Sequence, residues 1–165
     1  MSVEVKITGS DQTKAKLMLL ANKISAAPLL MDEIGLFLRH SIRDRTSKGL
    51  NAEGESFKEY SNSWKKVRES VGLQTDKVDL FFGGSMLSSM THESNKDTTK
   101  VFFLDTPHVD LVAIPGKKKR GDHGTNRKVA SENEQLRPFF SISVKERKEI
   151  AKMYSNYIKS ILRKK

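Results

Sequence analysis

A glycine pair in the middle of the chain limits the possible folds more than any other feature. Gly83 and Gly84 follow an apolar run at residues 80–82 and precede a serine, Ser85. Glycine adopts positive φ angles without a Cβ clash, and a serine hydroxyl can accept a hydrogen bond from a backbone N–H two or three residues later. Residues 77–90 therefore predict an extended run that enters the core at Leu80, a sharp turn, and a short helix capped by Ser85.

The residues after the glycine pair favour an architectural role over a catalytic one. Met86, Leu87 and Met90 share one face of the predicted helix. No Gly-Lys-Ser/Thr follows, as a phosphate-binding loop requires, and the segment is not a Gly-x-Ser-x-Gly nucleophile elbow. We interpret residues 77–90 as a joint between structural elements.

Apolar periodicity predicts long helices toward both ends of the chain. One begins near Gln12 and a second covers residues 29–48, with Gly49 as its stop. A third, short helix starts at Ser61 or Ser63 and ends at Gly72. Ser143 and Glu146 form a capping box that opens the final helix. The apolar stripes of the three longer helices are Leu17, Leu20, Ala21 and Ile24; Leu30, Ile34, Phe37, Leu38 and Ile42; and Ile150, Met153, Tyr154, Tyr157, Ile158 and Ile161.

Two shorter segments predict strands, and a third is either a strand or a short helix. Val3, Val5 and Ile7 alternate with polar residues, and residues 98–104 are too apolar to be exposed on both faces. Residues 108–114 are apolar but too short for periodicity to separate strand from helix. At 165 residues we expect one domain, residues 1–165, of class α+β, in which a small antiparallel β-sheet packs against long N-terminal and C-terminal helices.

The formal charge of +10 is concentrated in two places. The segment from Ser143 carries eight basic residues against two glutamates, and a glycine-containing stretch carries six more. We expect this stretch, about residues 115–135, to be a long exposed basic loop or arm that contacts a neighbouring subunit or DNA. A passive solvated surface is the alternative. The basic residues of the stretch are Lys117, Lys118, Lys119, Arg120, Arg127 and Lys128.

Several classes of chemistry find no support in the sequence. Without cysteine there is no disulfide, thiolate nucleophile or cysteine-ligated zinc, and the four histidines lack metal-ligand spacing. We expect no catalytic residues, no bound metal and no cofactor. A metal-dependent nuclease built on scattered carboxylates is the weakest alternative. No window is apolar enough to span a membrane and no signal peptide is visible, so we expect a protein made in the cytoplasm.

A sequence-independent nucleic-acid-binding module is the stronger alternative. The basic clusters would attract phosphates, and such binding weakens steeply with salt. No aromatic residues interleave the basic stretch to stack bases, and no recognised nucleic-acid motif surrounds it.

The order of several short motifs resembles a known family. Residues 42–46 close a helical region, a glycine and an aromatic follow at Gly54 and Phe57, and then come Tyr60 and Ser61. Two further motifs follow, Leu-Phe-Phe-Gly-Gly-Ser-Met-Leu-Ser-Ser-Met at 80–90 and Leu-Arg-Pro-Phe-Phe-Ser-Ile-Ser at 136–143. Across residues 40–160 this pattern is similar to the virion-morphogenesis and tail-completion proteins of tailed bacteriophages, which join head to tail. The family commonly has threonine where this chain has Gly83.

The resemblance implies a structural, non-enzymatic subunit of the virion neck or head-proximal tail end, assembled in the bacterial host cytoplasm. Its partners would be copies of itself in a hexameric or dodecameric ring, connector or neck proteins, and tail-tube or tail-terminator proteins, with non-specific contact to packaged DNA and none to a membrane. The residues that carry the resemblance are structural: Leu80, Gly83, Gly84, Ser85, Met86, Arg137, Pro138 and Phe139.

Overall fold

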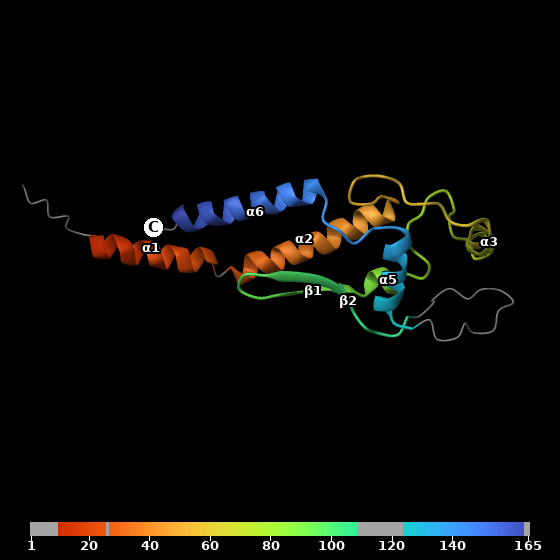
Figure 1. The fold of residues 1–165 in the computed structure, drawn as a ribbon, viewed down its shortest axis with the longest axis horizontal. Helices are drawn as coiled ribbons and strands as arrows, with labels where there is room; N and C mark the ends of the chain where they lie inside the picture. The colour runs from red at the N-terminus through yellow and green to blue at the C-terminus, as the bar shows by residue number, and fades with distance from the viewer. Residues whose placement is uncertain (1–9, 26, 109–123, 164–165) are drawn as a thin grey trace, which may run out of the picture.

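The computed structural model describes residues 10–25, 27–108 and 124–163 (Figure 1). Helices and a two-stranded antiparallel sheet make up this part of the chain, so the predicted α+β class is confirmed. The elements are α1 (Ser10–Ser25), α2 (Pro28–Ser47), α3 (Asn62–Ser70), α4 (Ser85–Ser88), β1 (Met90–Ser94), β2 (Thr99–Phe103), α5 (Asn126–Leu136) and α6 (Val144–Arg163).

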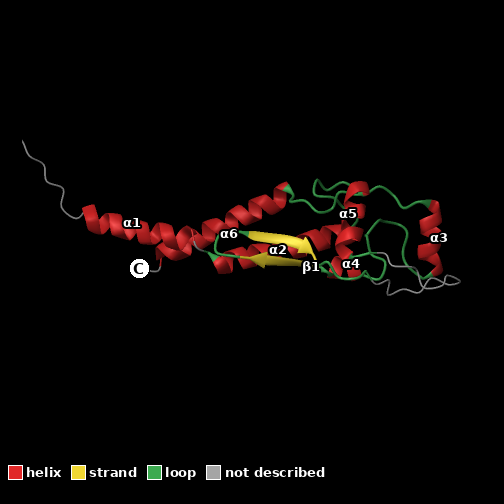
Figure 2. Cartoon of the chain, turned by 60° about the horizontal axis from the view of Figure 1, so that its bottom comes forward, coloured by secondary structure: helices red, strands yellow, loops and turns green. Residues whose placement is uncertain are grey.

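Helix α2 is the central layer of an elongated molecule. The β1–β2 hairpin lies along one side of α2 and α6 lies along the other (Figures 1 and 2). Helix α1 continues away from the start of α2 and is accompanied by the C-terminal part of α6. Helices α3, α4 and α5 gather at the opposite end (Figure 1).

The sequence explains why α2 takes the central place. Pro28 occupies the first turn, where its missing N–H costs no hydrogen bond, and Gly49 ends the helical region with a φ of +82°. Residues three and four apart then point to both neighbouring layers. The buried residues of α2 are Leu30, Met31, Ile34, Gly35, Leu38, Ile42 and Thr46.

The hairpin pairs β1 with β2 from Met90↔Phe103 to Ser94↔Thr99. The predicted strand at 98–104 is thus confirmed. Met90, predicted to lie on a helical face, instead begins β1, because α4 ends at Ser88. The hairpin approaches α2 closely at Gly35, where an added Cβ would lie 2.4 Å from His92 Cδ2.

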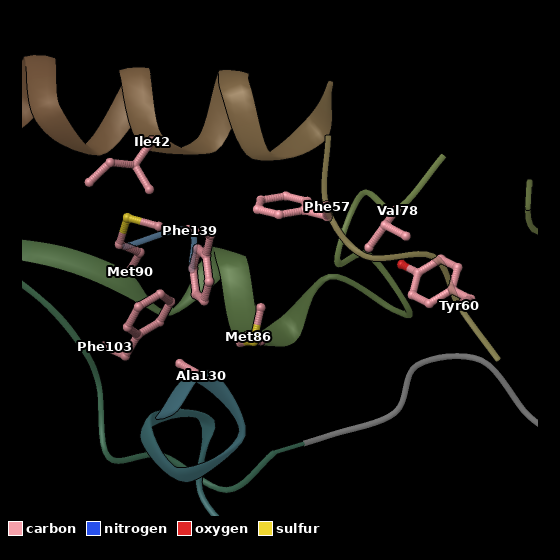
Figure 3. Packing of buried hydrophobic residues seen from close by; sticks show 9 residues of the cluster. All are labelled: Ile42, Phe57, Tyr60, Val78, Met86, Met90, Phe103, Ala130 and Phe139. Atoms are coloured by element: carbon pink, nitrogen blue, oxygen red, sulfur yellow. The ribbon is translucent and has the colours of Figure 1, made fainter. Parts of the chain in front are cut away.

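Two apolar clusters stabilise the fold. The first joins α2 to α6 and the hairpin through Leu30, Ile34 and Leu38, against which Val101 and Ile150 pack. The second lies where the end of α2 meets α4, α5 and the hairpin (Figure 3). Its buried members are Ile42, Phe57, Tyr60, Val78, Met86, Met90, Phe103, Ala130 and Phe139.

Most predicted helix ends are confirmed by their hydrogen bonds. Ser61 caps α3 by accepting from the Trp64 N–H at 3.3 Å, and Gly72 beyond the helix has a φ of +73°. The capping box opening α6 is reciprocal: Glu146 N donates to Ser143 Oγ at 3.1 Å, and Ser143 N donates to Glu146 Oε2 at 2.7 Å.

The prediction of a loop over residues 115–135 is wrong for its second half, which forms α5. Thr125 caps this helix by accepting from the Lys128 N–H at 3.4 Å, and Ala130 buries its methyl group in the core. With so few inward apolar residues, the helical period is weak in the sequence. Residues 115–123 lie outside the described residues, as do the predicted strand at 2–7 and most of the apolar run at 108–114.

Candidate functional site

The glycine joint between the 74–82 segment and α4 is the natural starting point for a site. Gly83 and Gly84 have φ angles of +119° and +81°, as the predicted turn requires. Gly84 rather than Ser85 is the N-cap of α4, and α4 has no side-chain cap, so the predicted capping role of Ser85 is wrong. The reason is that the Ser85 hydroxyl is engaged in contacts outside the helix.

The apolar run before the glycines does not form the predicted extended segment. Leu80 has a φ of +52°, and Phe81 is 43% exposed. Leu80 nevertheless packs against the second cluster, while Phe82 lies against Trp64 with ring centroids 4.9 Å apart. The run therefore covers the core instead of passing through it.

The buried guanidinium of Arg68 holds this segment in place. The residue is 1% exposed and lies on α3. Its Nε donates to the Gln74 carbonyl at 2.8 Å, its Nη2 donates to Asp79 Oδ1 at 3.1 Å, and its Nη1 donates to the Phe81 carbonyl. One side chain thus connects α3 to three points of a nine-residue segment, and the ion pair with Asp79 neutralises its charge.

Tyr60 completes this network. Its hydroxyl donates to Asp79 Oδ1 at 3.3 Å and accepts from the Leu80 N–H at 3.2 Å, and the Arg68 guanidinium lies 4.6 Å from its ring centroid. Burial raises the pKa of the phenol above its usual value, although the charge of Arg68 opposes the shift. Tyr60 therefore stays neutral at physiological pH, and its hydroxyl both donates and accepts a hydrogen bond.

Ser85, His108 and Asn126 form a polar cluster beside the joint. Ser85 Oγ lies 3.0 Å from His108 Nδ1 and 3.2 Å from Asn126 Oδ1, and His108 Nδ1 lies 2.7 Å from the same amide oxygen. The Asn126 amide nitrogen donates to Thr106 Oγ1 at 3.0 Å. The cluster ties α4, the segment after β2 and the start of α5 together.

A hydroxyl beside an imidazole also occurs in nucleophilic catalysis, so the proton positions matter. An amide oxygen only accepts, so with the Asn126 nitrogen donating to Thr106, His108 Nδ1 must carry the proton that it shares with Asn126. The protonated Nδ1 cannot take a proton from Ser85, whose own hydroxyl donates to Asn126. The arrangement stabilises structure and does not activate Ser85 through this nitrogen.

The Arg-Pro-Phe-Phe motif packs against the same core. Phe139 is fully buried, and the Arg137 guanidinium donates to the carbonyls of Lys58 at 2.8 Å and Glu59 at 3.1 Å. Pro138 is exposed and separates these two anchors. Glu134 accepts from the backbone N–H groups of Phe139 and Phe140, both at 2.9 Å.

Arg45 on α2 secures the segment after Phe139. Its guanidinium donates to the carbonyls of Phe139, at 2.8 Å, and Ser141, and it forms an ion pair with Glu146 at the start of α6. Sequence reasoning missed Arg45, Arg68 and Asn126 as structural residues. The only available signal for Arg45 was its place in the 42–46 motif.

The predicted basic surface is only partly described. Arg127 and Lys128 lie exposed on the first turn of α5, and Arg127 pairs with Asp105 at 3.7 Å. Lys117, Lys118, Lys119 and Arg120 lie outside the described residues.

Two hollows flank these anchors. One of about 230 Å³ lies beside the joint and is lined by Trp64, Phe82, His108 and Glu132, among others. The second, about 680 Å³, lies between β2 and α5. Within the described ranges, no group of three or more acidic, histidine or cysteine side chains could hold a metal ion, and no helix is long and apolar enough to cross a membrane.

Comparison of the chain with protein-family models, with curated proteins and with solved structures gave no match.

Replacing Arg68 with methionine should destabilise the fold by about 3–5 kcal/mol, because Asp79 would keep a largely buried charge without its partner. Chemical denaturation followed by circular dichroism measures this loss. Arg68→Met combined with Asp79→Asn should recover part of it. Arg127→Met is the matched control: its exposed pair with Asp105 should contribute no more than about 1 kcal/mol. Equal losses for Arg68→Met and Arg127→Met would contradict this account.

Gly84→Val should cost more stability than Gly54→Val. Both positions have similar positive φ angles, +81° and +86°, so the backbone strain, about 1–2 kcal/mol, is shared. Only at Gly84 would an added Cβ meet another group, Phe81 Cε2 at 2.9 Å, whereas nothing lies within 4 Å at Gly54. Overpacking should add about 1–3 kcal/mol. Thermal unfolding of both variants checks the difference, and matching midpoints would show that the contact with Phe81 is unimportant.

Proposed function

We propose that this chain is a structural, non-enzymatic subunit of a tailed-phage virion that completes or joins the tail at the head as a member of a homo-oligomeric ring. Its location would be the neck or the head-proximal end of the tail, after assembly in the bacterial host cytoplasm. Connector or neck proteins and tail-tube or tail-terminator proteins would be its partners.

The observation that carries the proposal is the exposed apolar surface of α1. Leu17, Met18 and Leu19 are about 60% exposed on a helix at one end of the molecule (Figure 1). Consecutive exposed apolar side chains are unfavourable in a free monomer and are typical of a surface that another protein covers. A subunit that assembles with copies of itself would bury such a surface against a neighbouring subunit.

The arrangement of the two motifs gives further support. Met86 and Met90 from the glycine motif and Phe139 from the Arg-Pro-Phe-Phe motif all belong to one buried cluster (Figure 3). The polar residues around them, Arg45 and Arg68, donate to backbone carbonyls and carboxylates of the protein itself. The motifs that resemble the phage family thus stabilise the fold, as we expect for a structural subunit.

A sequence-independent nucleic-acid-binding module is the second candidate, and α6 provides its specific observation. One face of α6 carries five exposed basic side chains at spacings of three, four and seven residues. Such a stripe follows one side of a helix and can lie along a phosphate backbone. In a ring around a DNA channel, this stripe would be the surface that faces packaged DNA. Its members are Lys145, Lys148, Lys152, Lys159 and Arg163.

Native mass spectrometry and negative-stain imaging of the full chain test the ring proposal. We expect one closed oligomer, a hexamer or dodecamer, either alone or once tail-tube or connector proteins are added. A chain that stays monomeric at all concentrations and with these partners would overturn the proposal.

Salt titration of DNA binding tests the second candidate. Affinity for duplex DNA should fall steeply with salt, and Lys148→Gln with Lys152→Gln should reduce the slope of log K against log salt by about 2, since each phosphate contact contributes about 0.9. Electrophoretic mobility shifts at several salt concentrations measure it. Lys65→Gln on α3, where the lysine pairs with Glu59, is the control that should leave the slope unchanged. A slope that does not respond to the α6 changes would exclude this stripe as a DNA surface.

A further inference from the structure

Helix α1 has more apolar surface than the described part of the chain covers. Leu17, Met18 and Leu19 are 63%, 59% and 62% exposed, whereas Leu20 beside them is half-buried. Consecutive residues on a helix are separated by about 100°, so this trio extends over roughly half of the circumference. Among the described elements, α6 runs along one side of α1 (Figure 1) and leaves the trio uncovered.

The groove between β2 and α5 is a surface with the matching chemistry. Its volume is about 680 Å³. Two carboxylates, Glu93 and Glu134, and two cations, Lys100 and Arg127, line it, so its charge is balanced and it has no excess attraction for phosphates. Aromatic rings and one methyl group form the apolar part of the lining: Phe102, Phe103, Phe139, Phe140 and Ala130.

Helix α1, called the arm from here on, cannot reach the groove of its own subunit. Ala27, at the junction of α1 and α2, donates its N–H to the Lys96 carbonyl at the hairpin turn, 2.7 Å away. The groove begins at the Glu93–Lys100 pair, next to the hairpin turn, and extends toward the other end of the hairpin as far as Phe103, about 10 Å further along β2. From the junction α1 runs in the opposite direction (Figure 1), which takes Met18 roughly 10 Å further away. The occupant must come from another molecule.

We infer that α1 of one subunit docks through Leu17, Met18 and Leu19 into the groove between β2 and α5 of a second copy. This inference rests on the proposed self-assembly and names its contact. Arm and groove are different surfaces, so the contact is heterologous and repeats from subunit to subunit until a ring closes. Lys14 and Lys16 precede the trio, and the exposed carboxylate of Glu93 at the edge of the groove is the group that would pair with one of them.

A complementation experiment with two variants of the full chain tests the contact. Met18→Glu disables the arm and leaves the groove intact, and Phe102→Glu disables the groove and leaves the arm intact. We expect each variant alone to be monomeric by native mass spectrometry, and an equimolar mixture to give a 1:1 heterodimer and nothing larger, because only one intact arm meets one intact groove. Assembly of either variant like the parent, or a mixture that stays monomeric, would overturn the inference.

Cross-linking supplies a measurement that introduces no charge into the groove. The chain has no cysteine, so Met18→Cys and Ser131→Cys, on exposed positions of α1 and α5, can be prepared separately and mixed. Oxidation should give a disulfide-linked heterodimer from the mixture. Ser63→Cys, at an exposed position on α3, is the matched control and should not cross-link to Met18→Cys. A Met18→Cys homodimer in place of the heterodimer would show that two arms pair with each other, and would overturn the arm–groove contact.

The two proposals fail in different ways. If the parent chain forms a ring but Met18→Cys and Ser131→Cys do not cross-link, the arm–groove contact is wrong and the proposed function stands. If the parent chain remains monomeric with and without tail-tube or connector proteins, both are wrong.

Discussion

The end of the molecule that carries the glycine joint depends on one buried guanidinium. Arg68 is buried on α3. Its guanidinium donates hydrogen bonds to the Gln74 carbonyl, the Phe81 carbonyl and the Asp79 carboxylate, and so fixes the position of the 74–82 segment against α3. Directed hydrogen bonds from Arg68 add to the apolar contacts of Val78 and Leu80 in fixing this irregular segment. The position of the glycine joint, of α4 and of the polar cluster around His108 follows from that arrangement. Arg45 has the same role for the segment that leads into α6.

The exposed charged and apolar surfaces lie on different elements of the fold. Arg68, which is buried, and Arg45, which is half-buried, are neutralised by carboxylates of the same chain, while five exposed cations form a stripe along α6. Three consecutive exposed apolar residues lie on α1, and the apolar part of the groove beside α5 consists of buried and half-buried side chains. The apolar trio on α1 and the basic stripe on α6 therefore share no residues.

Much of the helical framework could be predicted from the sequence, because α2 and α6 have regular apolar stripes and clear end signals such as Pro28, Gly49 and the Ser143–Glu146 box. Strand β1 and helix α5 could not. Strand β1 is polar at Thr91, His92 and Glu93, and His92 reaches α2 only because Gly35 has no side chain. Arg68 could not be recognised as a buried residue, since its acceptors come from a segment whose path is itself set by the contact. The place of the glycine turn was predictable, but the partners of Ser85 were not.

The length and position of α2 have a mechanical consequence. With twenty residues it is about 30 Å long, and it belongs to both apolar clusters, one near the arm and one near the glycine joint. A force applied to α1 is therefore transmitted along α2, a single helix packed on two sides, to the end of the molecule that holds the glycine joint. In an assembly under load, such a subunit would transmit tension from one neighbour to the next with little change in its own shape.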